Sequence, residues 1–412
     1  MESHSNGCSA GGSGIVHDRA KLCRLVFYKF NRFEKAKIFI PLGRDRAAKV
    51  PQRKAMQLSF NIFSLTLLLG AAQGFFLALL LFERKRNQTA NLMLAFLVSF
   101  YSVYITDVAF GMMNYQQSFP HLIGVTTGLP FLFGPLHYLY ARLMISPGRS
   151  FEKRDWLHFL PFVIFKAYML PFHLSSAPEK LQFMQNMAEA GEPFALIGFE
   201  WAMILQGNIY MILSLLLLRR HAKTIKNSFS SIDKINLSWL RNITIGATCI
   251  WLSVLILNIL PVIGHTLTEN ADKFIAPATA VFIYVMGYLS LRQREALSGE
   301  VDLTRVPKYQ KSGLPSEQAE NYLHRLRQFM ETKKIYAKND LTLNELAERL
   351  AIPAHHLSQI INDRLQQNFY DFVNNYRVEE AKKRLLDPAY QHLTILAIAY
   401  EVGFSSKSVF NA

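Results

Sequence analysis

The chain has 412 residues, of which 50% are hydrophobic and 18% are charged, and its formal net charge is +15. This composition excludes an intrinsically disordered chain and argues against an ordinary soluble globular protein. The three cysteines, Cys8, Cys23 and Cys249, stand far apart in the sequence, so neither a disulfide scaffold nor a structural metal site is predicted.

Residues 1–55 are basic, with 12 Lys and Arg against four Asp and Glu. They lack the apolar core and small-residue cleavage site of a secretory signal. Met56 stands close before the first long apolar stretch. We interpret 1–55 as an extension upstream of a native start at or near Met56, either non-native or disordered. A basic arm that binds anionic lipid and an organelle-targeting peptide are the alternatives.

Most of the apolar residues are gathered into seven stretches, and crossing a hydrocarbon core takes about 17–25 mostly apolar residues. The first stretch has no ionisable side chain, whereas the fourth is the weakest because Pro161, Lys166 and Pro171 lie near or inside it. Residues 56–291 are therefore predicted to form an all-α, seven-helix transmembrane bundle. The expected spans lie near residues 58–82, 91–113, 122–145, 156–174, 194–218, 242–264 and 273–291.

Lys and Arg are distributed unevenly among the loops of this bundle. The loops 83–90, 146–155 and 219–241 hold 12 of them, whereas 114–121, 175–193 and 265–272 hold one, Lys180. Positive residues stay on the cytoplasmic side of a membrane, so the first set of loops is predicted to be cytoplasmic. Seven spans then place the N-terminus outside and the C-terminal tail inside.

Three ionisable residues, Asp107, Lys166 and Glu200, fall within the expected spans. Each is about seven or eight residues from the outer boundary, which is about 10–12 Å deep at 1.5 Å per residue. An ionised side chain near the bilayer centre costs about 2.5–3.5 kcal/mol, so such residues usually pair or line a wet cavity. They predict either an outward-facing ligand pocket or a structural ion pair between helices.

The composition changes after Leu291. Residues 292–316 are polar and contain Gly and Pro, which predicts a linker. Residues 317–412 carry 12 Lys and Arg against 12 Asp and Glu and have the character of a soluble domain. Helical periodicity returns over Tyr322–Thr332.

Residues 342–362 have the pattern of a helix-turn-helix. Thr342 and Glu345 have the spacing of a capping box, and Ala347 is small enough for two helices to cross closely. Apolar residues stand at 346, 350, 352, 357 and 360, the positions that lock two helices at a steep angle. The outer face of the second helix is expected to carry hydrogen-bonding groups suited to bases or phosphates, namely His355, Ser358, Gln359 and Asn362.

The same pattern recurs 52 residues later, where Ala399 corresponds to Ala347. Gly403 permits a left-handed turn, which Ala351 supports less well. A long helix over Phe369–Leu386 is predicted between the two motifs. Two motifs on one rigid connector can place two recognition helices about one DNA turn apart, in successive major grooves.

On these residues the tail resembles the DNA-binding domain of AraC/XylS-type transcription regulators, in the subset carried on a multi-span membrane domain. The motifs are the paired helix-turn-helices, Arg377-xxx-Ala381-xxx-Leu385-Leu386, and the Gly403-Phe404 turn, and they cover about a quarter of the chain. The resemblance implies a regulator in the bacterial inner membrane, with its tail in the cytoplasm on promoter DNA. An unknown small-molecule or membrane signal and a second copy of the chain are its further expected partners.

The resemblance also implies DNA contacts from the first recognition helix and, in the second, from Lys407, Ser408 and Asn411, with Phe410 packed inward. Arg377 either contacts a phosphate or ties the connector to the first motif. Gln366 stands where the family usually has Gly, which implies some strain or a different turn. The chain ends at Ala412, about 20 residues before the family's usual end, so the second recognition helix is expected to be incomplete.

Two other interpretations stay open. The chain could be a seven-span receptor or transporter whose helical tail docks a protein partner, or an inactive fragment of a regulator. The sequence contains no phosphate-binding Gly loop, no catalytic serine motif and no metal-ligand spacing, so neither an enzyme nor a cofactor is predicted.

Overall fold

The computed structural model describes residues 62–85, 87–113, 115–146, 150–233, 235–263, 272–292 and 314–411. Over these ranges the chain is helical, as predicted, and its β-type pairing is an isolated bridge between Phe229 and Thr342. The expected extension 1–55 and residues 293–313 of the expected linker lie outside the described residues. The chain divides into two compact units.

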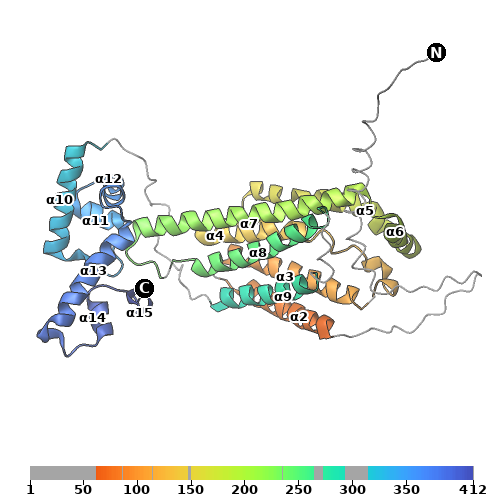
Figure 1. Cartoon of the computed structure of the whole chain (residues 1–412), viewed down its shortest axis with the longest axis horizontal. Helices are drawn as coiled ribbons and strands as arrows, with labels where there is room; N and C mark the ends of the chain where they lie inside the picture. The colour runs from red at the N-terminus through yellow and green to blue at the C-terminus, as the bar shows by residue number, and fades with distance from the viewer. Residues whose placement is uncertain are drawn as a thin grey trace, which may run out of the picture. The chain divides into compact units, whose positions relative to one another are not determined.

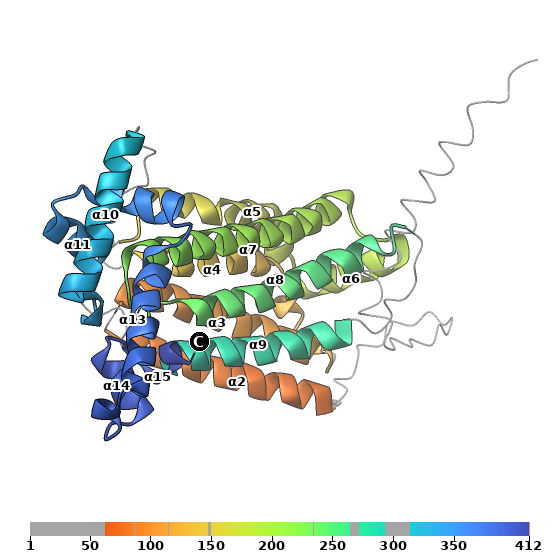
Figure 2. The same cartoon turned by 60° about the vertical axis from the view of Figure 1, so that its left-hand side comes forward.

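The first unit comprises the chain up to residue 144 together with 148–214 and 242–291. Its described part is a bundle of long helices that run side by side (Figures 1 and 2). Its helices are α2 (Ile62–Glu83), α3 (Gln88–Gly111), α4 (Pro130–Ile145), α5 (Leu160–Leu174), α6 (Ala177–Ala190), α7 (Phe194–Ser228), α8 (Ser238–Ile259) and α9 (Asp272–Arg292), with the 3₁₀ turns η2 (Tyr115–Gln117), η3 (Pro120–Leu122) and η4 (Lys153–Phe159). The end of α7 and the start of α8 belong to the second unit.

Each expected span overlaps a helix, but the helices differ in length. Among the described residues, five helical segments are long and apolar enough to cross a membrane: Ile62–Glu83, Gln88–Gly111, Lys153–Leu174, Phe194–Ser228 and Ser238–Ile259. The third expected span is shorter than predicted, because α4 begins at Pro130 and has 16 residues, while 122–129 form turns. The apolar part of α9 is Pro277–Leu291. The number of spanning helices, seven, therefore stays a prediction.

Helix α2 exposes large apolar side chains on more than one face. Leu67 and Leu81 are buried on one face, yet Ile62 and Leu69 on other faces are each 72% exposed. A helix that is apolar on all sides does not face water, and large exposed apolar areas mark a surface that contacts a partner or a membrane. The surface of α2 is therefore suited to an apolar environment.

Small residues let some of these helices approach closely. A Cβ atom added at Gly207 of α7 would lie 2.4 Å from the ring of Trp251 in α8. Such contacts between small and large residues are typical of helices that pack within a bilayer.

The second unit comprises residues 145–147, 215–241 and 292–412. Its further elements are α10 (Ser316–Lys333), η6 (Ile335–Ala337), α11 (Leu343–Leu350), α12 (Ala354–Gln359), the π-helical turn η7 (Ile360–Arg364), α13 (Phe369–Leu386), η8 (Pro388–Tyr390), α14 (Ile395–Glu401) and α15 (Lys407–Phe410). One core includes Leu326, Met330, Leu346, Leu357 and Phe369. A smaller core contains Ala381, Ile398, Ala399, Val402 and Phe404. Helix α13, which has the bounds predicted for the connector, contributes to both cores.

The connection between α7 and α8 is part of this second unit, although the sequence analysis places it among the loops of the bundle. Its Ile232 and Ile235 are buried with Ile225 of α7, and Phe229 and Tyr370 pack against them. Because Tyr370 belongs to α13, this apolar cluster holds the connection against the connector helix.

Candidate nucleic-acid interface

The first helix-turn-helix consists of α11, a left-handed turn and α12. The Oγ1 atom of Thr342 accepts a hydrogen bond from the amide of Glu345 at 3.2 Å, as the predicted cap requires. Ala351 ends α11 with φ +49°, and the amide of Ile352 donates to the carbonyl of Ala347 at 3.0 Å. The turn therefore redirects the chain within two residues.

The second helix-turn-helix repeats this geometry in α14 and α15. The Oγ1 atom of Thr394 accepts from the amide of Ala397 at 3.1 Å, and the amide of Phe404 donates to the carbonyl of Ala399 at 3.0 Å. Gly403 has φ +104°, and a Cβ atom there would lie 2.6 Å from the carbonyl oxygen of Tyr336. The glycine is therefore required both by its conformation and by its close contact with η6, which precedes the first motif.

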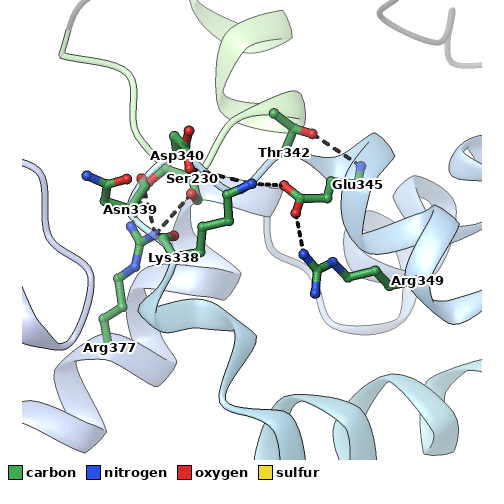
Figure 3. A network of polar contacts seen from close by, with 8 residues as sticks. All are labelled: Ser230, Lys338, Asn339, Asp340, Thr342, Glu345, Arg349 and Arg377. Carbon is green, nitrogen blue, oxygen red and sulfur yellow. Dashed lines mark hydrogen bonds and ion pairs between the residues drawn. The ribbon is translucent and has the colours of Figure 1, made fainter.

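Arg377 of α13 is the central polar group of this unit. Its side chain is 1% exposed, and its Nε atom donates to the carbonyl of Tyr336 at 2.8 Å. Its Nη2 atom donates to the carbonyl of Lys338 at 2.7 Å and to the Oγ atom of Ser230 at 3.1 Å (Figure 3). Its Nη1 atom donates to the carbonyl of Ser230 and to Oδ1 of Asn374, both at 3.0 Å.

With a longer contact from Nη2 to the carbonyl of Asn339 at 3.4 Å, these hydrogen bonds use all five N–H groups of the guanidinium. The acceptors are neutral oxygens, and burial lowers the pKa of Arg377 to about 10, so the group stays charged at neutral pH. Of the two roles the sequence left open for Arg377, the geometry is closer to a tie, although its acceptors lie in the segment just before the first motif and in the connection between α7 and α8 rather than in the motif itself.

Glu380, one turn further along α13, joins the segment before the first motif to the second motif. Glu380 is 8% exposed. Its carboxylate accepts hydrogen bonds from Lys334 Nζ at 3.0 Å, Tyr336 Oη at 3.2 Å and Arg384 Nε at 3.2 Å. Burial by itself raises the pKa of Glu380, but the hydrogen bonds from Lys334 and Arg384 hold it below its usual value. Arg384 continues the network to Glu401 of α14 at 2.8 Å.

The residues expected to contact DNA from the first recognition helix differ in their exposure to solvent. His355 and Gln359 are partly exposed on α12. Ser358 was expected on the outer face, but it is 9% exposed. The Nδ2 atom of Asn362 donates to the carbonyl of Ser358 at 2.7 Å and lies 3.3 Å from its Oγ atom. The π-helical turn η7 follows α12 directly, so the α-helical spacing that predicted the position of Asn362 does not continue through it.

The second recognition helix exposes its expected polar residues. Lys407, Ser408 and Asn411 are exposed on or next to α15. Phe410 packs inward, with its ring centroid 5.2 Å from that of Phe404, as predicted for the apolar knob. Three polar side chains are therefore available on this helix.

Gln366 has φ +53°, which agrees with the strain expected where the family usually has Gly. Its Nε2 atom donates to the carbonyl of Asp363 at 2.7 Å, which stabilises the turn after η7.

Sequence reasoning missed two important residues of this unit, Glu380 and Ser230. The spacing of Glu380 and Arg384, four residues apart on a predicted helix, was a usable signal. Ser230 had none, because it precedes Arg377 by 147 positions and lies in a loop without a motif.

In the first unit, Asp107 and Lys166 hold the same short segment. Asp107 accepts hydrogen bonds from Tyr115 Oη and, at 2.6 Å, from Thr126 Oγ1. Lys166 Nζ donates to the carbonyl of Val125 at 2.7 Å. Their geometry fastens residues 124–126 to the neighbouring helices.

Glu200 lies on α7 and is partly exposed. Together with burial, its charge raises the pKa of Glu192, in the connection before α7, to about 7. Among the described residues, no cluster of three His, Cys, Asp or Glu side chains could hold a metal ion.

Comparison with known proteins gives matches in the tail. A family model described as a helix-turn-helix domain matches residues 346–412. Over 77 residues the chain is 38% identical to proteins named uncharacterized HTH-type transcriptional regulators from Staphylococcus aureus strains COL, MSSA476 and N315. The match covers 19% of this chain and about a tenth of the length of these curated relatives. No solved structure matches the chain.

Proposed function

We propose that the chain, whose residues 346–412 carry a helix-turn-helix domain, is a transcription regulator of the AraC type that binds promoter DNA. The observation that carries the proposal is the repetition of one motif 52 residues apart, with the same Thr cap and the same backbone hydrogen bond across the turn. The names of the relatives in Staphylococcus aureus support the same class of function.

In this proposal α12 and α15 are the recognition helices. Lys407, Ser408 and Asn411 are exposed on or next to α15, and His355 and Gln359 are partly exposed on α12. Ser358 and Asn362 reach it only after they release their mutual hydrogen bond. Arg377 positions the connector, because its donors are already used inside the unit.

A mobility-shift experiment tests DNA binding directly. The full chain in detergent micelles is titrated onto the DNA upstream of its own coding sequence, with unrelated DNA as competitor. We expect a specific shift whose log affinity falls linearly with log salt concentration, because bound Lys and Arg displace counterions from phosphates. A folded chain that shifts no DNA, or shifts both DNAs equally, refutes the proposal and favours a tail that docks a protein.

We further propose that the first unit lies in the bacterial inner membrane with the tail in the cytoplasm. The support is the five long apolar segments and the 12 Lys and Arg in one set of loops against one in the other. Single cysteines at Asn186 in α6 and at Thr224 near the end of α7, in a chain without its native cysteines, test this topology. An impermeant maleimide applied outside should label N186C and spare T224C; the reverse pattern contradicts the proposal.

The signal is proposed to reach the first unit, where Asp107, Lys166 and Glu200 remain the candidate ligand-binding residues. A ligand can change DNA affinity only by binding two states of the protein unequally, and a change in pairing with a second copy of the chain would supply such states. D107N and E200Q, expressed at normal levels, are expected to weaken the response of a transcriptional reporter to its signal. An unchanged response in both variants rejects this site.

A further inference from the structure

The connection between α7 and α8 contacts both helix-turn-helix motifs. Its residues 229–233, which we name the docking segment, have the sequence Phe-Ser-Ser-Ile-Asp. At the first motif, Phe229 forms the isolated bridge with Thr342, and the amide of Ser230 donates to the carbonyl of Leu341 at 3.0 Å. The carbonyl and the hydroxyl of Ser230 are two of the acceptors that hold Arg377.

At the second motif, the docking segment contacts the two residues that precede α15. The hydroxyl of Ser231 donates to that of Ser405 at 2.8 Å. The Oδ2 atom of Asp233 accepts from the hydroxyl of Ser405 at 2.9 Å and from that of Ser406 at 2.6 Å. Ser406 also caps α15, since its Oγ atom accepts from the amide of Val409. The segment is therefore bound to the start of the second recognition helix.

The docking segment is held by contacts along its whole length. Ser230 is fully buried, and Ile232 is 7% exposed within the apolar cluster that includes Tyr370 of α13. Five residues of loop are thus anchored at one end by a buried arginine, in the middle by an apolar side chain, and at the far end by a carboxylate. A loop that only joined two helices would need none of these anchors.

The position of Asp233 opposes DNA binding. Ser405 and Ser406 immediately precede Lys407 and Ser408, which the proposed function places on the DNA. A carboxylate bonded there adds a negative charge beside the expected position of the phosphates, and like charges brought together at an interface cost binding free energy. It also occupies two hydroxyl groups that could otherwise donate to phosphate oxygens.

We propose that the docking segment is an autoinhibitory clamp, which holds the second helix-turn-helix away from DNA until the segment is released. This inference rests on the proposed function. Because the segment joins α7 to α8, both of which continue into the apolar unit, a signal that shifts these helices would act on the clamp.

A reversible lock tests the clamp in the full chain. The variant carries S231C and S405C in a background where Cys8, Cys23 and Cys249 are serine. The two hydroxyl oxygens lie 2.8 Å apart, so we expect a disulfide to form on oxidation with little movement. We expect the oxidised form to bind DNA at least about tenfold more weakly than the same protein after reduction, because locking removes the binding-competent population.

A second variant tests the charge without a lock. D233N keeps the size of the side chain and removes its charge, and we expect it to bind DNA about three- to tenfold more tightly than the parent. E379Q is the matched control, because Glu379 is an exposed carboxylate of α13 paired with Lys382. Its affinity should stay within about twofold of the parent, which measures the general effect of removing one negative charge.

Each outcome decides between the proposals. If the parent binds DNA and neither the lock nor D233N changes its affinity beyond the control, the clamp is wrong and the proposed function stands. If the locked form binds more tightly, or D233N more weakly, the segment is a brace that assists binding, and the clamp is equally wrong. If the cysteines do not cross-link, the segment is not docked. If no form binds DNA although the cross-link forms, the DNA-binding function itself fails and the clamp with it.

Discussion

Replacing Arg377 with methionine tests whether the buried guanidinium holds the helix-turn-helix unit together. Methionine has a similar length and no donor, so it leaves the carbonyl oxygens of Tyr336, Lys338 and Ser230 without this partner. Each buried polar group left unsatisfied costs about 1–3 kcal/mol. The guanidinium is a buried charge with no carboxylate partner, so replacing it also removes the free-energy cost of burying that charge, and this gain opposes the loss of the hydrogen bonds.

The loss should win, because the orphaned acceptors are main-chain carbonyls that no side-chain change can remove. Three buried carbonyl oxygens lose this donor, and at about 1–3 kcal/mol each their combined cost exceeds the desolvation energy that is returned. Native domains are stable by about 5–15 kcal/mol. We therefore expect R377M to consume a large part of the unit's stability, and R377K, which keeps the charge and three donors, to lie between R377M and the parent.

Hydrogen exchange of the full chain, followed by mass spectrometry, measures this effect locally. Amides of α13 and of the docking segment should exchange far faster in R377M than in the parent, because local opening of the unit becomes less costly. R327M is the control, since Arg327 is exposed on α10. If R377M shows protection within about 1 kcal/mol of R327M, the guanidinium is not what holds the unit, and the reasoning is refuted.

Three further predictions follow from the same unit. G403A should lower the melting temperature of the unit, because a Cβ at this position would lie 2.6 Å from the carbonyl oxygen of Tyr336. Q366G should be neutral or should stabilise the unit by up to about 1 kcal/mol, because Gln366 is already left-handed. If thermal melts show the opposite order of the two variants, the assignment of the turns is wrong. The pKa of Glu380 is lower in the folded state than its unfolded value of about 4.3, so its ionised carboxylate stabilises the unit above that pH, and this stability is lost as the pH falls through the folded pKa. The melting temperature of E380Q should therefore change less than that of the parent between about pH 5 and pH 3. An unchanged pH profile argues against the network. K407A should reduce the salt dependence of DNA binding by about one unit of slope, and an unchanged slope in mobility shifts would remove Lys407 from the interface.

Local signals were enough to predict much of the tail. The cap at Thr342, the small residues at the helix crossings and the bounds of α13 all depend on residues within one or two turns of one another, which periodicity and capping rules describe directly. At Gln366 it was the resemblance to a family that usually has Gly there that implied strain or a different turn, and the residue is left-handed in the structure. The apolar stretches likewise predicted the long helices of the first unit, although α4 begins only at Pro130 and the helix α6 lies in the expected loop 175–193.

The tertiary structure decided which segments fold together. The sequence allowed two roles for Arg377, and its partner Ser230, 147 residues away, indicates the tie. It placed Ser358 on an outer face, whereas the residue is buried and hydrogen-bonded to Asn362. It assigned 219–241 to a loop of the bundle, and that loop packs on the connector helix. Hydrogen bonds and apolar contacts between distant segments depend on the whole packing arrangement, which the local pattern of the chain does not encode.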